Sequence, residues 1–545
     1  MPRSEAQPLR DPEPDASGLC APASRPRIPG GLPQTVAEVL DPAVARSPDA
    51  LALIGRHGRY RFAELDREVN RAAALLAQLG VGPGERVAAC LPNDVDIAIA
   101  FLATQRLGAL WVGLNRPLAA PEKAYVLSDC GALVLLAMPE ACEQLRPLRG
   151  SLPALTQLLR VDPDSASCEW RAGLRAFPTA ARPAHAIDPF APAAIAYTSG
   201  TTGYPKGAVH SQHNLLVPGA VSHLTKKFPP GIRQASVLPL TILNLIVLEL
   251  LVAYVDGRCM VCIDRIDAPG LAEWVEREQV GTFTGVPTIF HDLLTHPDVR
   301  PEQLASLVEA GMGGSDVPPE TVALYKKRFG KSVAIGYGMT EAPTAVTWSD
   351  GQVPLGPGLC GRPLPQCCIE ILDEAGRVLP QGEVGEICVS PAREGPFAGL
   401  YTPMLGYWGK PEATRKALAG GRYHTGDLGL LAEDGNLYIR GRRNELILRG
   451  GANVYPAEVE RILEAHPAVA AAAVFGRPDP RLGERVVAAV ELLPGASASE
   501  EELRAHALLQ LARYKVPEKI RFTERMPRNA MNKIVKRELH ALLDG

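Results

Sequence analysis

The sequence predicts an α/β protein with a large N-terminal domain of mostly parallel sheets covered by helices, and a small α+β C-terminal domain. Up to about residue 290, strand-like apolar runs alternate with helical patterns joined by short turns, which is typical of parallel sheet. Past residue 360, strand runs separated by Gly-containing turns predict a small antiparallel β unit. At 545 residues the chain exceeds what one hydrophobic core serves, so at least two domains are expected.

The first elements can be followed from the N-terminus. Residues 1–32 hold seven prolines and little apolar periodicity, which predicts a disordered or loosely attached leader. Residues 62–80 predict a helix whose apolar positions share one face and which ends at Gly80. The elements expected next are a buried strand at 85–93, a helix at 94–108 and a strand at 109–115.

The composition excludes several classes of function. A net charge of −3 gives no basic surface for nucleic acid or for an anionic membrane. The first residues lack an apolar signal segment, and polar residues interrupt the longest apolar run at 238–255, so we expect a cytoplasmic protein without a membrane span. Eleven cysteines in so long a chain favour a reduced protein, with Cys259 and Cys262 as core residues rather than metal ligands.

The strongest motif is YTSGTTGYPKG, from Tyr197 to Gly207. Its hydroxyls and glycine-rich backbone can turn donors toward a polyphosphate, and Lys206 supplies a permanent positive charge. The spacing differs from that of the P-loop, which needs four residues between its glycines and then Gly-Lys-Ser/Thr. The phosphate-binding residues expected here are Thr198, Ser199, Gly200, Thr201, Thr202, Gly203 and Lys206.

Further motifs follow in order along the chain. They are GYGMTEA at 336–342, GYWGKPEAT at 406–414, YHTGDLG at 423–429, GRRNELILRGGANVYPAEVE at 441–460 and PRNAMNKIVKREL at 527–539. With the phosphate motif, this ordered set resembles the adenylate-forming superfamily, which includes acyl- and aryl-CoA synthetases, peptide-synthetase adenylation domains and luciferase-like enzymes. The resemblance runs from about residue 35 to 539.

The resemblance implies a domain organisation. After the leader at 1–32, residues 33–442 would form an adenylation domain that holds ATP and the acid. Residues 443–445 would form a hinge, and 446–545 a mobile C-terminal domain. Asn444 stands where relatives usually carry Lys or Asp; asparagine can absorb a large backbone change, so it remains a plausible pivot.

The resemblance also implies ATP, Mg²⁺ and coenzyme A as cofactors. Thr201 and Glu341 would be the oxygen ligands of Mg²⁺, a hard cation that keeps several waters. Tyr337 would stack on adenine and Thr340 would bond the α-phosphate. Around them, the nucleotide pocket would include Gly314, Ser315, Gly336 and Gly338.

Three residues in the C-terminal third carry further implied roles. Asp427 would bind the ribose hydroxyls, and Arg442 the same ribose or a phosphate. Lys533 would bridge the acid and the α-phosphate as pyrophosphate leaves, so that Lys533, Thr340 and Lys206 form the catalytic set. Asn532 replaces the glycine that usually precedes this lysine, and asparagine tolerates the left-handed backbone region.

Gly450 and Gly451 would line the face on which the thioester forms, since a backbone without side chains lets the pantetheine arm pass closely. At the position where the family opens a helix with histidine, the chain has Gln212, followed by His213, which we expect to be structural.

The acyl pocket is expected around Thr241, Ile242 and Asn244. Amino-acid-activating relatives place an aspartate where Ile242 stands, and an unpaired buried ammonium is costly, which disfavours an α-amino acid. The apolar neighbours favour an aliphatic, alicyclic or aromatic acid.

The sequence therefore predicts an ATP-dependent carboxylic acid–CoA ligase that forms an acyl-adenylate and then a thioester, releasing AMP and pyrophosphate. Its partners would be a small acid and CoA, and a homodimer is left open. One alternative is an enzyme that transfers the acyl group to a carrier-protein thiol. A non-catalytic nucleotide-binding protein is disfavoured, because nothing else requires Lys206, Glu341, Asp427 and Lys533 together.

Overall fold

The computed structural model describes residues 11–22, 24–165, 167–198, 205–314, 317–342, 344–349, 351, 356–449, 452–479, 482–529, 533–536 and 538–539. By their internal packing, the residues fall into two compact units, one of 1–369 and 389–424 and the other of 370–388 and 425–545. The dividing points fall inside three strands: β16 (Cys367–Leu372), β17 (Gly385–Pro391) and β19 (Tyr423–Leu431). Residues 425–442 thus pack with the C-terminal part, and the hinge expected at 443–445 stays a prediction.

The first unit is α/β, as the alternating pattern predicts. Its helices are η1 (Val36–Glu38), α1 (Asp41–Arg46), α2 (Phe62–Gln78), α3 (Val95–Arg106), α4 (Ala120–Cys130), α5 (Pro139–Leu145), η2 (Arg146–Ser151), α6 (Glu169–Arg175), α7 (Gln212–Thr225), α8 (Leu243–Leu245), the π-helical η3 (Ile246–Leu251), α9 (Val252–Asp256), α10 (Ala268–Glu278), α11 (Pro287–Thr295), η4 (Pro301–Leu304), α12 (Pro319–Phe329), α13 (Pro411–Ala417) and η5 (Ala419–Gly421).

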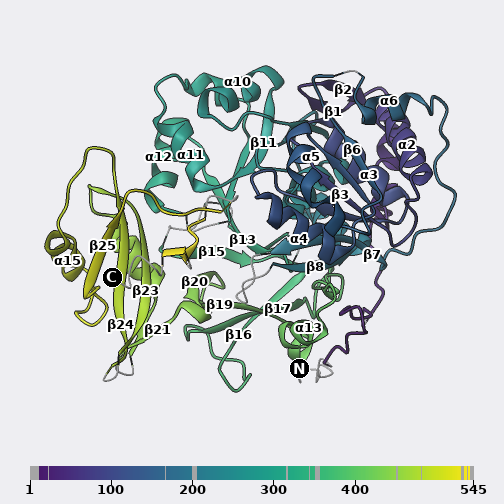
Figure 1. Cartoon of the computed structure of the whole chain (residues 1–545). Helices are drawn as coiled ribbons and strands as arrows, with labels where there is room; N and C mark the ends of the chain where they lie inside the picture. Colours follow the sequence, from purple (N-terminus) through teal and green to yellow (C-terminus); the bar gives the residue numbers. More distant parts are fainter. Residues whose placement is uncertain are drawn as a thin grey trace. The chain divides into compact units, whose positions relative to one another are not determined.

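One sheet of this unit has the strand order β18-β8-β7-β4-β3-β5-β6. Its strands are β3 (Arg86–Cys90), β4 (Leu110–Gly113), β5 (Val134–Ala137), β6 (Gln157–Arg160), β7 (Pro192–Thr198), β8 (Lys206–Ser211) and β18 (Gly406–Tyr407). Strands β3 to β7 pair in parallel, and β8 reverses direction against β7. Helices α2, α3 and α6 lie beside these strands in Figure 1.

A second run of strands has the order β15-β14-β13-β12-β11-β9-β10-β1-β2. Its strands are β1 (Leu51–Gly55), β2 (Gly58–Arg61), β9 (Arg233–Ser236), β10 (Cys259–Cys262), β11 (Val280–Gly285), β12 (Glu309–Gly313), β13 (Val333–Met339), β14 (Thr344–Ser349) and β15 (Leu359–Pro363). Strands β9 to β13 pair with one another in parallel, whereas β14 is antiparallel to β13. The prediction of mostly parallel sheet is confirmed.

The predicted elements near the N-terminus are confirmed. Helix α2 buries Leu65, Val69 and Leu76 on one face, as the spacing predicts. The strand, helix and strand expected at 85–115 are β3, α3 and β4. The predicted leader differs, because from residue 11 it packs on the first unit: Leu19 pairs with Gly406, and the apolar Ile28 is buried in the core.

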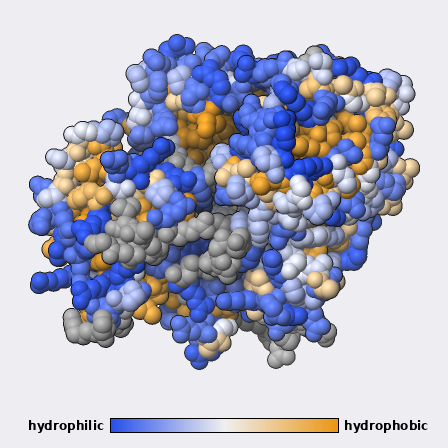
Figure 2. Space-filling model, in the orientation of Figure 1, coloured by the Kyte–Doolittle hydropathy of each residue, from blue (hydrophilic) through white to orange (hydrophobic). Residues whose placement is uncertain are grey.

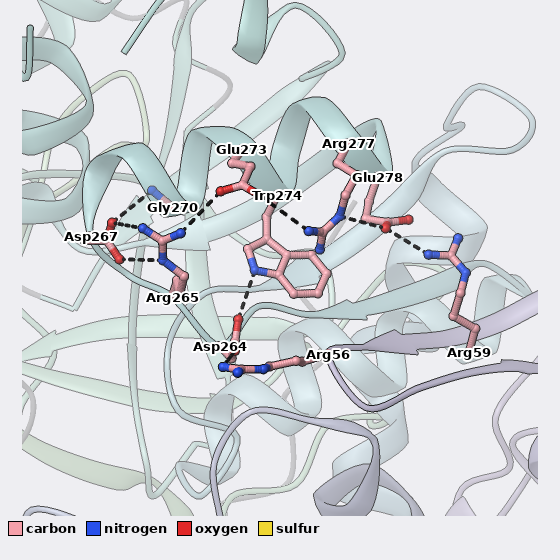
Figure 3. A network of polar contacts seen from close by, with 10 residues as sticks. All are labelled: Arg56, Arg59, Asp264, Arg265, Asp267, Gly270, Glu273, Trp274, Arg277 and Glu278. Atoms are coloured by element: carbon pink, nitrogen blue, oxygen red, sulfur yellow. Dashed lines mark hydrogen bonds and ion pairs between the residues drawn. The ribbon is translucent and has the colours of Figure 1, made fainter. Parts of the chain in front are cut away.

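Ionic contacts fix helix α10 to neighbouring strands on the surface of the first unit. Trp274 donates its indole N–H to Asp264 at 2.9 Å, and Arg59 of β2 binds Glu278 at 2.8 Å. Both contacts are drawn in Figure 3. Arg233 of β9 binds the same Glu278 carboxylate at 3.0 Å. The view in Figure 2 shows this part of the surface as hydrophilic, in keeping with a helix that covers the sheet and faces water.

The second unit contains the antiparallel strands expected past residue 360 and an α+β tail. Its elements are β16 (Cys367–Leu372), β17 (Gly385–Pro391), β19 (Tyr423–Leu431), β20 (Leu437–Arg442), η6 (Arg443–Glu445), β21 (Ile447–Arg449), β22 (Ala452–Val454), α14 (Pro456–Glu464), β23 (Val469–Asp479), β24 (Gly483–Leu492), α15 (Glu500–Leu508) and β25 (Lys519–Thr523). The tail sheet has the order β22-β21-β24-β23, with β25 parallel to β24. Among the described residues, no helix has the length and apolarity needed to cross a membrane.

Candidate active site

The hairpin of β7 and β8 carries the predicted phosphate loop. Thr198 at the end of β7 is in register with Lys206 at the start of β8, so both flank the loop at its base. The Lys206 ammonium lies 4.3 Å from the centre of the Tyr407 ring. The loop residues Ser199, Gly200, Thr201, Thr202 and Gly203 lie outside the described residues, so the metal role of Thr201 stays a prediction.

Glu341 follows strand β13 and faces this hairpin. The residue is 9% exposed, and its Oε1 accepts hydrogen bonds from the Tyr407 hydroxyl at 2.9 Å and from Thr198 Oγ1 at 3.3 Å. Burial lowers the pKa of Lys206, and the nearby Glu341 carboxylate opposes that shift. A carboxylate beside a hydroxyl is a set of hard oxygen donors, which fits Mg²⁺.

The main chain of Thr340 is held by a buried histidine. His210 Nε2 donates to the Thr340 carbonyl at 2.7 Å, and its Nδ1 accepts from the Asn214 amide at 3.2 Å. Complete burial lowers the pKa of His210 to about 4, so the imidazole is neutral near pH 7 and keeps one tautomer. His210 therefore fixes the backbone between Tyr337 and Glu341.

The residues expected around adenine lie on β13 and at the end of β12. Gly336 is in register with Gly313, and a Cβ at Gly336 would approach the Trp348 ring to 2.8 Å, so a side chain does not fit there. Gly314 has a φ of +83°, in the left-handed region that favours glycine. Tyr337 and Gly338 continue β13, whereas Ser315 lies outside the described residues.

In the second unit, Asp427 and Arg442 face each other across strands β19 and β20. They are in register, and Arg442 Nε lies 2.6 Å from Asp427 Oδ1. Asp427 is buried, at 6% exposure, which makes its carboxylate a fixed acceptor. Lys533 is exposed, yet the atoms crowded around its ammonium lower its pKa; Arg442 adds to that shift and Asp427 opposes it. The structure thus brings these three predicted residues together.

Two of the predicted acyl-pocket residues, Thr241 and Asn244, are polar residues in an apolar region of the first unit, against which Ile242 packs. Thr241 Oγ1 donates to Asn115 Oδ1 at 2.6 Å. A Cβ at Gly113 would lie 1.8 Å from the Thr241 carbonyl oxygen, so glycine lets the two backbones touch. Asn244 has a buried Oδ1 with no hydrogen-bond partner among the described residues, and Ile242 is partly exposed. Their roles toward an acid stay predictions.

The predicted thioester face and pivot are described only in part. Gly450 and Gly451 lie outside the described residues. Asn444 is the middle residue of η6, between β20 and β21, so the expected hinge coincides with a short 3₁₀ turn. His213 stacks on Phe190 with ring centres 4.6 Å apart and bonds the Leu400 carbonyl at 2.9 Å, which supports the structural role expected for it.

Sequence reasoning missed three residues of the site: Tyr407, His210 and Asn115. Tyr407 lies in the GYWGKPEAT motif, which was available as a signal although no role followed from it. His210 and Asn115 gave no signal, since their partners are 130 and 126 residues away in the chain.

The buried Glu341 carboxylate lies beside the base of the β7–β8 hairpin, which carries the phosphate motif. With a large α/β unit followed by a small α+β part, this arrangement is the one expected of an adenylate-forming enzyme. The chain matches the AMP-binding enzyme family over residues 40–408 and the AMP-binding enzyme C-terminal domain over 458–533, and it belongs to that family.

Named relatives agree with this assignment. The chain is 36% identical over 500 residues to a feruloyl-CoA synthase of Amycolatopsis, covering 90% of this chain and 96% of the relative. It is 31% identical over 528 residues to the fatty acid–[acyl-carrier-protein] ligase ScoC of Streptomyces coeruleorubidus, covering 93% and 96%. The structure of the anthranilate CoA ligase AuaEII with anthranoyl-AMP superposes with a TM-score of 0.83 at 25% identity, covering 94% and 98%. The chain is thus an AMP-forming acid–thiol ligase, of a family that uses ATP and CoA.

Proposed function

We propose that this enzyme joins an apolar carboxylic acid to coenzyme A in two half-reactions. In the first, a carboxylate oxygen attacks the α-phosphorus of ATP, and the bond to pyrophosphate breaks to give an acyl-adenylate. In the second, the CoA thiol sulfur attacks the acyl carbon, the bond to AMP breaks, and the thiol proton passes to solvent. Lys533 supplies positive charge in the first step.

The observation that carries this proposal is the cluster of Glu341, Thr198, Lys206 and Tyr407. A buried carboxylate that accepts from a threonine hydroxyl, next to a lysine at the base of a phosphate-type loop, supports a site for a polyphosphate with its cation. Mg²⁺ bound there would neutralise phosphate charge; Glu341 and the loop hydroxyls would hold it. Gly314 at the end of β12 carries no side chain, so a nucleotide would approach the backbone closely there.

The proposed acid is apolar because of what surrounds Thr241 and Asn244. Leu240, Leu243 and Leu245 belong to the large apolar core cluster, and Ile242 packs against it. Ile242 itself offers no carboxylate, so an ammonium group that met this residue would lack a partner there. The relatives' names suggest which acids to test: a hydroxycinnamic acid, fatty acids and an aminobenzoic acid.

The test is pyrophosphate release from ATP with a panel of these acids, each with and without CoA. We expect acid-dependent pyrophosphate release, and AMP release together with consumption of the free thiol when CoA is added. No pyrophosphate release with any acid would contradict the proposal.

A second candidate is transfer to a carrier-protein thiol, which the similarity to the ScoC ligase favours. The same assay separates the two. Acylation of an added phosphopantetheinyl carrier protein, with CoA left unacylated, would replace the CoA proposal by this one.

A further inference from the structure

The chain reverses direction at the segment that carries Lys533. Val535 donates its backbone N–H to the Pro527 carbonyl at 2.8 Å, Arg528 and Ile534 form an antiparallel bridge, and Asn529 donates its backbone N–H to the Lys533 carbonyl at 2.9 Å. These contacts pair residues 527–529 with 533–535 as the two arms of a hairpin, with Lys533 at the start of the returning arm.

One side chain fixes the backbone of the lysine itself. Asn529 Oδ1 accepts the backbone N–H of Lys533 at 3.0 Å. Together with the bond from the Asn529 N–H, this ties Asn529 to both backbone polar groups of Lys533. Asparagine and aspartate suit such local bonds because their carbonyl carbon is attached directly to Cβ, which keeps the oxygen close to the backbone. A side chain without an acceptor at position 529 would remove this hydrogen bond, and the Lys533 N–H would bind only solvent.

Both arms of the hairpin are anchored beneath this contact. Before it, the Met526 N–H donates to Glu491 Oε2 at 2.8 Å. After it, the Lys536 ammonium lies 2.5 Å from Glu445 Oε2 and 2.8 Å from Glu460 Oε1. Met526 and Leu539 are buried in one apolar cluster, with Ile534 packed against it. The arms are therefore fixed, and among the described residues the bond from the Lys533 N–H to Asn529 Oδ1 sets the orientation of the lysine backbone.

We propose that Asn529 is a positioning residue for Lys533: its side-chain oxygen holds the Lys533 backbone so that the ammonium is presented to the charge that develops at the α-phosphate. This inference rests on the role of Lys533 in the proposed function. A lysine side chain is long, so a small rotation of its backbone moves the ammonium by an ångström or more. Misplacement by about 1 Å can cost about a hundredfold in rate.

The experiment compares four variants in each half-reaction measured separately. Asn529→Leu keeps the size and removes the acceptor, Asn529→Asp keeps the acceptor, Lys533→Ala removes the ammonium, and Glu524→Gln is a control on an exposed residue of the same segment. Pyrophosphate release at saturating ATP and acid reports adenylation, and thioester formation from supplied acyl-adenylate reports the second step.

We expect Asn529→Leu to lower the kcat of adenylation by about 10- to 100-fold, with the KM for ATP within about threefold and thioester formation unchanged. Asn529→Asp and Glu524→Gln should stay within about threefold of wild type. The split between kcat and KM and the rescue by aspartate separate positioning from a general loss of structure.

Other outcomes overturn the inference, and they do so in distinguishable ways. If Lys533→Ala lowers the kcat of adenylation but Asn529→Leu keeps the wild-type value, Asn529 does not position the lysine, while the role of Lys533 stands. If Lys533→Ala itself keeps wild-type adenylation, the proposed role of Lys533 fails first. If leucine and aspartate at 529 lower both half-reactions and the melting temperature alike, the residue is merely structural.

Discussion

Replacing the buried Glu249 by glutamine is expected to change how the stability of the first unit responds to pH. Glu249 lies on the π-helical turn η3 and is fully buried. Its Oε1 accepts the Thr284 N–H at 2.8 Å, its Oε2 accepts from the Gln234 amide, and Gln234 in turn accepts from Arg258 at 2.8 Å. Burial raises the pKa of Glu249 to about 7, although these hydrogen bonds and Arg258 oppose the shift.

The sign follows from proton binding. Between the ordinary pKa of 4.5 and the folded pKa of about 7, the folded protein holds a proton at Glu249 that the unfolded chain has lost. The free energy of unfolding therefore falls as pH rises through this window. At about 1.4 kcal/mol for each pH unit, the full loss is about 3 kcal/mol, of which about 2.5 kcal/mol falls between pH 5 and 8.

Glu249→Gln removes this titration. The glutamine oxygen can still accept from Thr284, but its NH₂ group then faces the Gln234 amide, which costs about 1–3 kcal/mol at every pH. We expect the variant to be less stable than wild type at pH 5, and the difference to shrink by about 2.5 kcal/mol by pH 8. Urea unfolding followed by tryptophan fluorescence at pH 5, 6, 7 and 8 measures this.

Glu278→Gln is the matched control, because its pH dependence has the opposite sign. Although burial alone would raise the pKa of Glu278, the Arg59, Arg277 and Arg233 guanidinium groups lower it below 4.5. The stability it contributes is present above its unfolded pKa and is lost only as pH falls through the lower folded value. The difference in the free energy of unfolding between wild type and Glu278→Gln should thus be constant from pH 5 to 8. A difference between wild type and Glu249→Gln that is equally constant would refute the reasoning.

Three further predictions concern the chemistry. Glu341→Gln should raise the Mg²⁺ concentration for half-maximal pyrophosphate release at least about tenfold, the equivalent of about 1.4 kcal/mol; an unchanged Mg²⁺ titration removes Glu341 from the metal site. Lys533→Ala should lower adenylation by about 10²- to 10³-fold and leave thioester formation from supplied acyl-adenylate within about threefold, and equal loss of both steps would contradict its role. Asn444→Pro fixes φ near −65° and should spare one half-reaction while the other fails; a variant that melts like wild type and runs both at full rate would place the pivot elsewhere.

The sequence was most informative where a motif is local. The phosphate motif is glycine-rich and flanked by apolar strands, so the chain turns there and Thr198 meets Lys206 in register. Asp427 was expected to bind the ribose hydroxyls and Arg442 the same ribose or a phosphate. The pairing of strands β19 and β20 does bring the two side chains to 2.6 Å. Such contacts follow from strand pairing between neighbours in the chain.

Contacts between distant segments could not be predicted in this way. The Tyr407 hydroxyl reaches Glu341 because β18 pairs with β8, a pairing that depends on the whole sheet. The leader was expected to be disordered or loosely attached from its prolines, yet one apolar residue, Ile28, is enough to contribute a buried anchor. Composition averages over such single contacts, so it cannot reveal them.

The two lysines assigned to the chemistry share one electrostatic arrangement. Loss of water around the ammonium is the main cause that lowers the pKa of each, through burial at Lys206 and through the atoms crowded around the ammonium at the otherwise exposed Lys533. In each case one carboxylate opposes the shift: Glu341 for Lys206 and Asp427 for Lys533. In such surroundings the one carboxylate does not offset the cost of removing water from the ammonium. The negatively charged phosphates of a nucleotide would offset it. Under the proposed function, both ammonium groups are therefore stabilised most when the negative charge on the phosphates is greatest, as pyrophosphate departs. This stabilisation is larger in the transition state than in the bound ground state. The surroundings that lower the pKa of the two lysines without nucleotide therefore favour the chemical step.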